Sequence, residues 1–463
     1  MKANTYPLGG LAVIQKVEKI YGLLSIVFDG IGGRMKDFLP IINLHIYNKL
    51  THSVATSKIL ETYCPELLEA LGLKSEAKDK SLFRALERIG KYFSIIHERY
   101  QEFLAKHGLI DDTQVIDFSS AYFEGTKCSL GKLGYSRDKR PDKQQLTFGI
   151  STGLNGISSA LTIQKGNVQD KVHMRQMLKI IKKVLPERTL LMFDAGANTK
   201  ANKEKIRSMG HHYLTLKPKK VGPYKKLIAY FYRNQDRVEH FQINGRNYHW
   251  ISVMKKGEYQ YIYFCPELYD VHINAREKKF MRSIAKGNQL LKKRKFEQLP
   301  SDKGWVQLVP ILQKNLVEIG NPYLNGVEGF FTLESSIKDD GFKILRLYKE
   351  RDKAEKFFRN IKEGIELRPL RHWNDDAILG IIFICFLANV MIYLTEMEAE
   401  NQAPEKRSNV KCLKKSLINL SLTVVYPDNG FRFSIMSNIS EKILQILGDF
   451  VWNYEDKSLK MRW

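Results

Sequence analysis

Residues 189–198 read TLLMFDAGAN, and this stretch decides the fold class. It joins a short apolar strand, Thr189–Phe193, to a turn of small residues that begins at Asp194. A helix is predicted just before it, over Gln169–Leu185, because apolar residues recur there at helical spacing. A long helix between two strands forms a crossover, which favours parallel pairing in a sheet covered on both faces. The sequence therefore predicts an α/β protein.

Further strand patterns lie on both sides of this segment. Thr113–Phe118, Gln145–Thr152 and Ala160–Gln164 read as strands upstream, and GFFTLES at 329–335 reads as a strand downstream. Strands that first form hairpins and then alternate with helices are the order of a ribonuclease H-like fold. We expect a mixed sheet flanked by helices.

The remaining patterns divide the 463 residues into four parts. Residues 1–108 have helical periodicity, typical of a DNA-binding or dimerisation domain but also of any helical bundle. The catalytic domain is predicted over 109–219 and 328–400. It is interrupted at 220–327 by a basic, β-rich insertion with a meander over Val238–Ile243, Asn247–Met254 and Tyr259–Cys265. Residues 401–463 are predicted as a C-terminal helical region.

The charge balance points to a polyanionic partner. Lys and Arg number 74 against 50 Asp and Glu, a net charge of +24, which favours nucleic acid first and an anionic membrane second. The five cysteines are scattered without CxxC spacing, so neither a disulfide framework nor a zinc site is supported. We expect a reducing cytosol and no signal peptide.

One uncharged segment, Ala377–Leu394, is 18 residues long and reaches the threshold for a membrane span. It is short for a span and stands alone in a strongly charged chain. The more economical interpretation is a fully buried helix, with Asn374 as its N-cap.

Two aspartates occupy positions that suit chemistry. Asp117 lies within the strand VIDFSSAYFEG, where alternation places it on one face with Val115 and Ser119. A carboxylate inside a covered strand is unfavourable unless a cation or hydrogen bonds compensate it, although an edge strand would leave it in water. Asp194 follows a strand end, where sites gather in α/β sheets, and small residues after it allow close approach.

A third acid, Glu355, belongs to YKERDKAEKFFRNIK at 348–362. On one helix at about 100° per residue, the residues Tyr348, Arg351, Glu355 and Lys362 share a stripe beside the apolar face. Taken alone, this stripe is equally typical of a salt-bridged surface. Agreement with the two aspartates favours a cleft that binds metal and phosphate. Carboxylate oxygens suit two Mg²⁺ ions, or Mn²⁺, for in-line phosphoryl transfer.

A strongly basic stretch, Arg276 to Lys295, holds nine Lys or Arg and one Glu. It is too one-sided for internal ion pairing, so we expect contact with phosphates. The candidate DNA-binding residues are Arg276, Lys278, Lys279, Lys292, Lys293, Arg294 and Lys295.

These motifs together resemble the insertion-sequence-four family of bacterial DDE transposases, in the branch with a β-rich insertion before the third acid. The matching elements are Asp117 in DFSSAYFEG, GYSRDKRPDKQQ (134–145), GNVQD (166–170), FDAGAN (193–198) and Tyr348-x2-Arg351-x3-Glu355-x6-Lys362. The resemblance covers about 110–395, and the last motif is its most specific part.

The resemblance implies a division of roles. Asp117, Asp194 and Glu355 would ligate the metals, and Tyr348, Arg351 and Lys362 would contact phosphates at the transposon end. In relatives an insertion-domain Trp stacks on a flipped base, for which Trp250 and Trp305 are both candidates, although a lone Trp more often belongs to a core. A homodimer would synapse two ends of double-stranded DNA in the bacterial cytoplasm, at the nucleoid, without a membrane or a nucleotide cofactor.

The main hypothesis is a transposase that cleaves at terminal inverted repeats and transfers the 3′ ends into target DNA. A ribonuclease H-like nuclease or resolvase that cuts without joining is the enzymatic alternative. A DNA-binding transposase relic without activity is the alternative from another class, and the three intact acids speak against it.

Overall fold

The computed structural model describes residues 2–31, 35–73, 77–124, 128–292, 321, 323–367, 370–372, 374–402, 410–428 and 430–454. The chain forms two compact units. The first comprises Met1–Met192, Glu204–His211 and Arg351–Trp463, and the second comprises Phe193–Lys203 and His212–Glu350. The predicted helical segment 1–108 lies within the first unit, together with the C-terminal residues.

The first unit contains the expected helices. Before the first long strand they are α1 (Gly9–Tyr21), α2 (Leu23–Val27), α3 (Met35–Leu50), α4 (Ile59–Thr62), α5 (Pro65–Ala70), α6 (Asp79–Lys91) and α7 (Phe93–Lys106). Near the C-terminus they are α14 (Asp352–Arg359), α15 (Asp375–Gln402), α16 (Val410–Asn419) and α17 (Glu441–Leu447).

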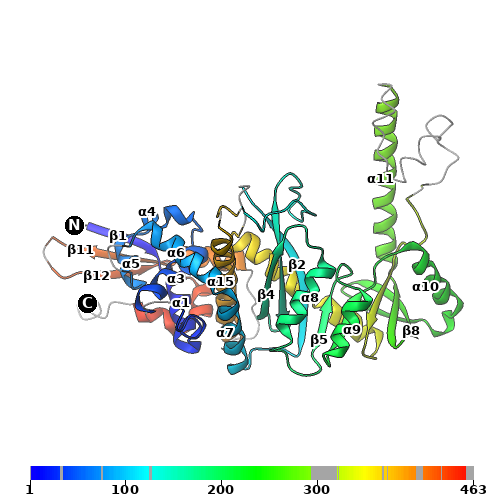
Figure 1. The fold of residues 1–463 in the computed structure, drawn as a ribbon, viewed down its shortest axis with the longest axis horizontal. Helices are drawn as coiled ribbons and strands as arrows, with labels where there is room; N and C mark the ends of the chain where they lie inside the picture. Colours follow the sequence, from blue (N-terminus) through cyan, green and yellow to red (C-terminus); the bar gives the residue numbers. More distant parts are fainter. Residues whose placement is uncertain are drawn as a thin grey trace. The chain divides into compact units, whose positions relative to one another are not determined.

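Helix α15 contains the uncharged segment and forms the centre of the first unit. It packs against α1, α3, α6 and α17. Figure 1 shows α15 among the helices of the first unit. A Cβ on Gly380 would lie 2.1 Å from the carbonyl oxygen of Leu86, so glycine allows α15 and α6 to touch backbone to backbone. Among the described residues α15 is the one helix long and apolar enough to cross a membrane, and 89% of its most apolar window is buried. This burial is what the core-helix interpretation requires.

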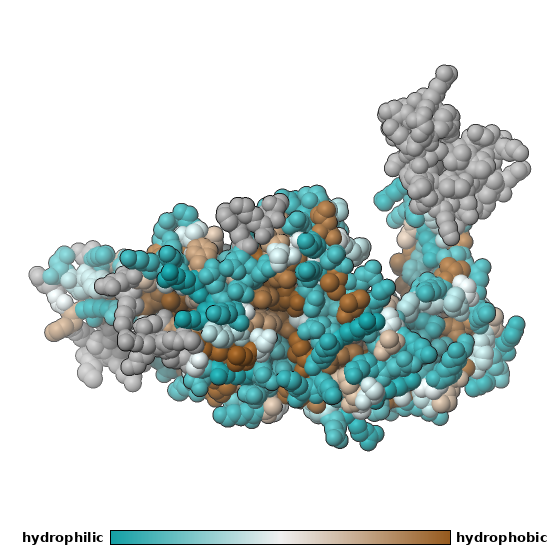
Figure 2. Space-filling model, viewed as in Figure 1, coloured by the Kyte–Doolittle hydropathy of each residue, from teal (hydrophilic) through white to brown (hydrophobic). Residues whose placement is uncertain are grey.

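Hydrophilic side chains cover most of the molecular face in Figure 2, and apolar side chains occupy smaller areas between them. Such a mixed surface is ordinary for a folded chain.

A small sheet joins the two ends of the chain. Strand β1 (Lys2–Pro7) pairs antiparallel with β11 (Ser421–Tyr426), which pairs antiparallel with β12 (Phe433–Ser437). Figure 1 shows blue β1 beside the orange β11 and β12. The prediction of a helical C-terminal region was therefore incomplete, because SLTVVY is rich in β-branched residues that favour a strand.

Four neighbouring strands form a sheet in the first unit. In spatial order they are β4 (Ser158–Lys165), β3 (Gln145–Gly153), β2 (Thr113–Tyr122) and β5 (Leu190–Phe193). β2, β3 and β4 are antiparallel, whereas the amide of Leu190 donates to the carbonyl of Asp112 at 2.8 Å, so β5 starts beside the start of β2. The crossover helix α8 (Asp170–Ile181) packs on β3 and β4. The predicted α/β class, with a mixed sheet flanked by helices, is confirmed.

Five neighbouring strands form a sheet in the second unit, in the order β6 (His212–Leu216), β10 (Phe330–Ser335), β9 (Glu258–Phe264), β8 (Arg246–Lys255) and β7 (Glu239–Ile243). Its helices are α9 (Lys200–Ser208, which ends in the first unit), α10 (Val221–Arg233), α11 (Pro266–Lys292) and α13 (Gly341–Lys349). The predicted meander is β7-β8-β9. The meander pairs through β9 with β10, and β10 pairs with β6. The predicted insertion at 220–327 therefore adds strands to a sheet that also contains β6.

Candidate active site

Asp117 lies in the middle of β2, on the face of the sheet that α14 covers. Its cross-strand partner is Ile150, and such partners point to the same face. Ile150 and Phe357 of α14 belong to one hydrophobic cluster. The Asp117 side chain is half-buried, and its carboxylate accepts a hydrogen bond from the amide of Phe118 at 2.9 Å. The strand therefore places an acid where a core residue is expected.

The predicted uninterrupted helix over 348–362 is wrong. α13 ends at Lys349, α14 begins at Asp352, and Asn360–Gly364 is π-helical. The break falls just after Glu350, the charged residue that an uninterrupted helix would place on its apolar face. Tyr348, which is half-buried, consequently belongs to α13 of the second unit, and Glu355 belongs to α14 of the first.

Glu355 forms an ion pair with Arg351, with 2.5 Å between the Glu355 Oε1 and an Arg351 guanidinium nitrogen. The Glu355 side chain is 45% exposed and that of Arg351 is 17% exposed. α14 packs on β2 and β3, so the helix with Glu355 and the strand with Asp117 touch within one unit. Two of the three predicted acids therefore lie on contacting elements.

Asp194 directly follows β5 and opens a tight turn in the second unit. The amide of Ala197 donates to the carbonyl of Asp194 at 3.1 Å, and the amide of Asn198 donates to Ala195 at 3.2 Å. The Asp194 side chain is half-buried. The expected turn at the end of this strand is therefore present.

Two ion pairs connect motifs that the sequence presents separately. The Lys362 amine donates to the Asp138 carboxylate at 2.9 Å, and these side chains are 10% and 1% exposed. The Arg137 guanidinium donates twice to the Asp170 carboxylate, at 2.7 and 2.6 Å. The Arg137 amide also donates to Ser120 Oγ of β2 at 3.2 Å. The loop 134–145 is thus held by β2, by GNVQD and by the turn after α14.

The glycine of GNVQD has a steric role in this arrangement. A Cβ on Gly166 would lie 1.9 Å from the carbonyl oxygen of Gln145, a contact that no side chain tolerates. The backbone at GNVQD therefore approaches β3 more closely than any other residue would allow.

The predicted DNA-binding cations differ in their surroundings. Lys278 and Lys279 are exposed on α11, and the Lys279 amine lies 4.1 Å from the centre of the Tyr323 ring. Arg276 instead donates to Asn325 at 3.1 Å and pairs with the buried Glu328, so it is engaged within the protein. Lys292 is the last residue of α11, and Lys293, Arg294 and Lys295 lie outside the described residues.

Trp250 belongs to the core of the second unit. Its side chain is 8% exposed and stacks on Tyr263 at a ring distance of 6.5 Å. In this state it is not available to stack on a base. The other candidate, Trp305, lies outside the described residues.

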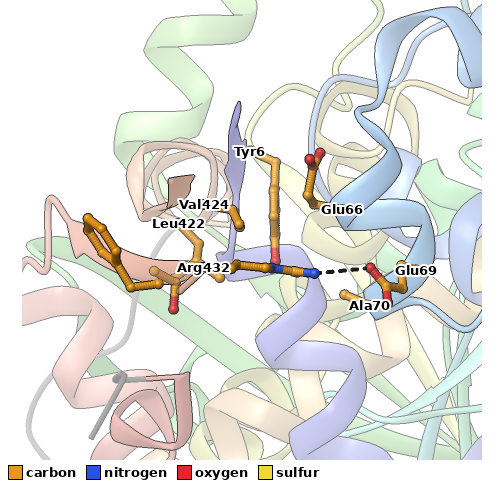
Figure 3. Close-up of a pocket in the computed structure, with 9 residues that line it drawn as sticks. Tyr6, Glu66, Glu69, Ala70, Leu422, Val424 and Arg432 are labelled. Carbon is orange, nitrogen blue, oxygen red and sulfur yellow. Dashed lines mark hydrogen bonds and ion pairs between the residues drawn. The ribbon is translucent and has the colours of Figure 1, made fainter. Parts of the chain in front are cut away.

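A separate cavity of about 410 Å³ lies between β1, α5 and the β11–β12 hairpin, away from these motifs in sequence (Figure 3). Arg432 points across it to Glu69, with 3.4 Å between the paired atoms. None of the predicted site residues lines it.

Within the described ranges, no group of three or more His, Cys, Asp or Glu side chains is arranged to hold a metal ion. The donor chemistry of Asp117, Asp194 and Glu355 nevertheless fits a hard divalent cation, since all three supply carboxylate oxygens. One oxygen of the Glu355 carboxylate, Oε1, is paired with Arg351, so a cation would compete with Arg351 for that oxygen.

Sequence reasoning placed Asp138 and Asn198 in motifs without finding their partners, and it did not single out Glu334; all three hold segments of the predicted site in place. Glu334 accepts a hydrogen bond from Asn198 at 2.8 Å, although the two residues are 136 positions apart in the chain. The strand pattern of GFFTLES could have flagged Glu334 as a carboxylate within a strand, and β10 is in fact buried along almost its whole length. Asp138 stands in a charged loop, which reads as surface in the sequence.

Comparison with known proteins identifies the class. Residues 109–391 match the model of the transposase DDE domain, and because the match spans more than half of the chain, the protein belongs to this family. The fold is also similar to a chain in the cryo-EM structure of the piggyBac transposase synaptic complex with hairpin DNA. That similarity has 10% sequence identity and a TM-score of 0.43, over 89% of this chain and 79% of the other. No curated protein sequence matches the chain.

Proposed function

We propose that this member of the DDE family is an active transposase of the insertion-sequence-four type. It would cleave double-stranded DNA at terminal inverted repeats and transfer the 3′ ends into target DNA. The observation that carries the proposal is the packing of α14, which bears Glu355, on β2, which bears Asp117. Two carboxylates on touching elements, with Arg351 beside one of them, are the expected constituents of a phosphoryl-transfer site.

Asp117, Asp194 and Glu355 are proposed to hold two Mg²⁺ ions, or Mn²⁺. β5 is the neighbour of β2, and Asp194 is the residue after β5, which supports a shared role for the two aspartates. When bound, the metal ions would activate the attacking oxygen and stabilise charge on the leaving oxygen. Transesterification conserves the number of phosphodiester bonds, so no nucleotide cofactor is needed.

Arg351 and Tyr348 are proposed to contact phosphates at the transposon end. Lys362 would do so by exchanging Asp138 for a phosphate. On α11, exposed Lys278 and Lys279 are better placed for DNA than Arg276, which is engaged by Glu328. We also propose a homodimer that synapses two DNA ends at the bacterial nucleoid.

The test is cleavage of labelled DNA that carries the inverted repeats flanking the gene. E355Q should abolish cleavage and retain DNA binding, because glutamine preserves shape and removes the metal-binding charge. K356Q, one position along α14 and 60% exposed, is the matched control and should cleave normally. Undiminished cutting by E355Q would refute the assignment.

Strand transfer separates the proposal from a nuclease or resolvase. A single-turnover reaction with target DNA should yield joined product, whereas hydrolysis alone would favour the nuclease. Metal-independent DNA binding without any nicking in Mg²⁺ or Mn²⁺ would favour a relic.

A further inference from the structure

Four charged side chains gather in the interior of the second unit. Glu334 on β10 accepts from Lys203 at 2.8 Å and pairs with Lys217. Lys203 also donates to Glu258 on β9 at 2.6 Å, and the Tyr213 hydroxyl donates to the same Glu258 oxygen at 2.8 Å. The Glu334 side chain is 3% exposed, and Lys203 is 13% exposed. Two ammonium groups and two carboxylates therefore share a nearly dry site.

Stability alone is a poor explanation for such a cluster. Removing charges from water is so unfavourable that apolar residues of similar volume often stabilise a fold equally well. Burial acts to raise the pKa of Glu334, but hydrogen bonds from Lys203, Lys217 and Asn198 outweigh it, and the pKa is lowered overall. Glu334 is thus held in its charged form, in which its hydrogen bonds are strong and directional.

The cluster holds the turn that begins at Asp194. The side-chain amide of Asn198 donates both to Glu334, at 2.8 Å, and to the carbonyl of Leu216, at 2.9 Å. Lys203 fastens the following helix, α9, to the same carboxylate. Asn198 is only four residues from Asp194, and backbone hydrogen bonds close the turn between them. A shift of Asn198 is therefore transmitted to the Asp194 backbone.

We propose that Glu334 is a positioning residue that acts through Asn198 and Lys203 to fix the Asp194 carboxylate for metal binding. This inference rests on the proposed function, in which Asp194 is a metal ligand. Glu334 does not itself touch the metal or the substrate. Residues that orient metal ligands typically change metal affinity about 10- to 100-fold when they are replaced.

The experiment measures Mn²⁺ binding to the full chain without DNA, from the electron paramagnetic resonance signal of free Mn²⁺. E334Q should bind Mn²⁺ about tenfold more weakly than the wild type. In cleavage assays the Mn²⁺ concentration for half-maximal rate should rise by a similar factor. The rate at saturating Mn²⁺ should stay within about twofold, because the metal-loaded site is unchanged in composition.

E328Q is the matched control. Glu328 is also a buried carboxylate of the second unit, 4% exposed, but its partners are the Arg276 guanidinium and the amide of Asn325, outside the turn after β5. E328Q should lower the melting temperature as E334Q does and leave Mn²⁺ binding unchanged. Equal losses of Mn²⁺ affinity in both variants would assign the effect to general destabilisation and overturn the proposal.

N198A provides a second route if E334Q folds poorly. It removes the link between Glu334 and the turn, so it should weaken Mn²⁺ binding to a similar extent. The double variant N198A/E334Q should be little weaker than either single variant, since both interrupt the same connection. In N198D/E334Q the two groups exchange roles, and part of the affinity should return.

The outcomes separate the two proposals. If the wild type binds no Mn²⁺ and cleaves no DNA, the proposed function fails. If the wild type does both, and folded E334Q and N198A bind Mn²⁺ as tightly as the wild type, only the role of Glu334 fails.

Discussion

The turn that carries Asp194 and the segment that carries Glu355 are built in opposite ways. Behind Asp194, Asn198 is 9% exposed and is tied to a carboxylate that is itself nearly buried. Glu355 lies on a helix of eight residues, α14, which is separated from α13 by two residues and is followed by a π-helical turn. The Glu355 side chain is 45% exposed. Asp194 is therefore held on a rigid turn, whereas Glu355 lies on a short helix that can shift.

The difference teaches which part of the site is set by the protein and which is set by its ligands. A braced carboxylate offers a fixed position before any cation arrives. Glu355 is instead paired with Arg351. A metal ion can take the place of Arg351 beside Glu355, and a phosphate can take the place of Glu355 beside Arg351. Bound DNA should therefore raise the metal affinity of Glu355 more than that of Asp194.

The largest effect is expected from displacing the carboxylates by one methylene. D194E should reduce the cleavage rate by roughly 10³-fold, because the turn held by Glu334 cannot shift to accommodate the longer side chain. E355D should reduce it by roughly 10²-fold or less, because the short helix α14 can shift. Rates of cleavage at saturating Mn²⁺ test this pair. Equal losses would mean that the two supports are equally rigid.

Removing the Lys362 amine should have the largest effect on stability. K362M leaves the Asp138 carboxylate, 1% exposed, without this partner, and breaking such a buried pair destabilises by about 3–5 kcal/mol. Urea unfolding monitored by circular dichroism measures the change. K356M is the control, because Lys356 and Asp352 are 60% and 55% exposed and should add little. A loss below about 1 kcal/mol in K362M would mean that the Lys362–Asp138 pair contributes no more to stability than an exposed pair does.

Acid should weaken the first unit before the second. Burial lowers the pKa of His45 and His97 to about 4 and that of His173 to about 3. In the unfolded chain these imidazoles are protonated below about pH 6.5, whereas in the folded unit they stay neutral down to about pH 4. Their contribution to the free energy of unfolding is therefore fully present above about pH 6.5 and is lost as the pH falls toward about 4. Hydrogen exchange at pH 7.5 and pH 5 should show earlier loss of protection in α3 and α7. Uniform loss across both units would contradict this.

The smallest change in stability is expected at Arg351. R351A removes an i,i+4 pair whose acid is half-exposed, so unfolding should change by only a few tenths of a kcal/mol. DNA binding in Ca²⁺ should nevertheless weaken several-fold, because a phosphate contact is lost. Filter binding at fixed salt provides the measurement, with K356A as control. Unchanged affinity would remove Arg351 from the proposed DNA contacts.

Local patterns predicted most of the first unit and of the sheet. Alternation in β2 and the meander β7-β8-β9 were recognisable because each depends on neighbours in the sequence. The same reasoning failed at 348–362, where helical periodicity continued through Glu350 although the helix does not. One charged residue hardly changes the helical periodicity of a sequence, but burying its charge on an apolar face costs a large amount of free energy.

The sequence by itself determined the class of this protein, because residues 109–391 match the transposase DDE domain. The order of strand and helix patterns along the chain also predicted the α/β fold, since each pattern depends on neighbouring residues. Only the tertiary structure decided which charges are engaged inside the fold. Lys362 finds Asp138 across 224 residues, and Asn198 finds Glu334 across 136. Such partners are chosen by the packing of strands and helices, because an ion buried away from water must find its counterion wherever the fold brings one.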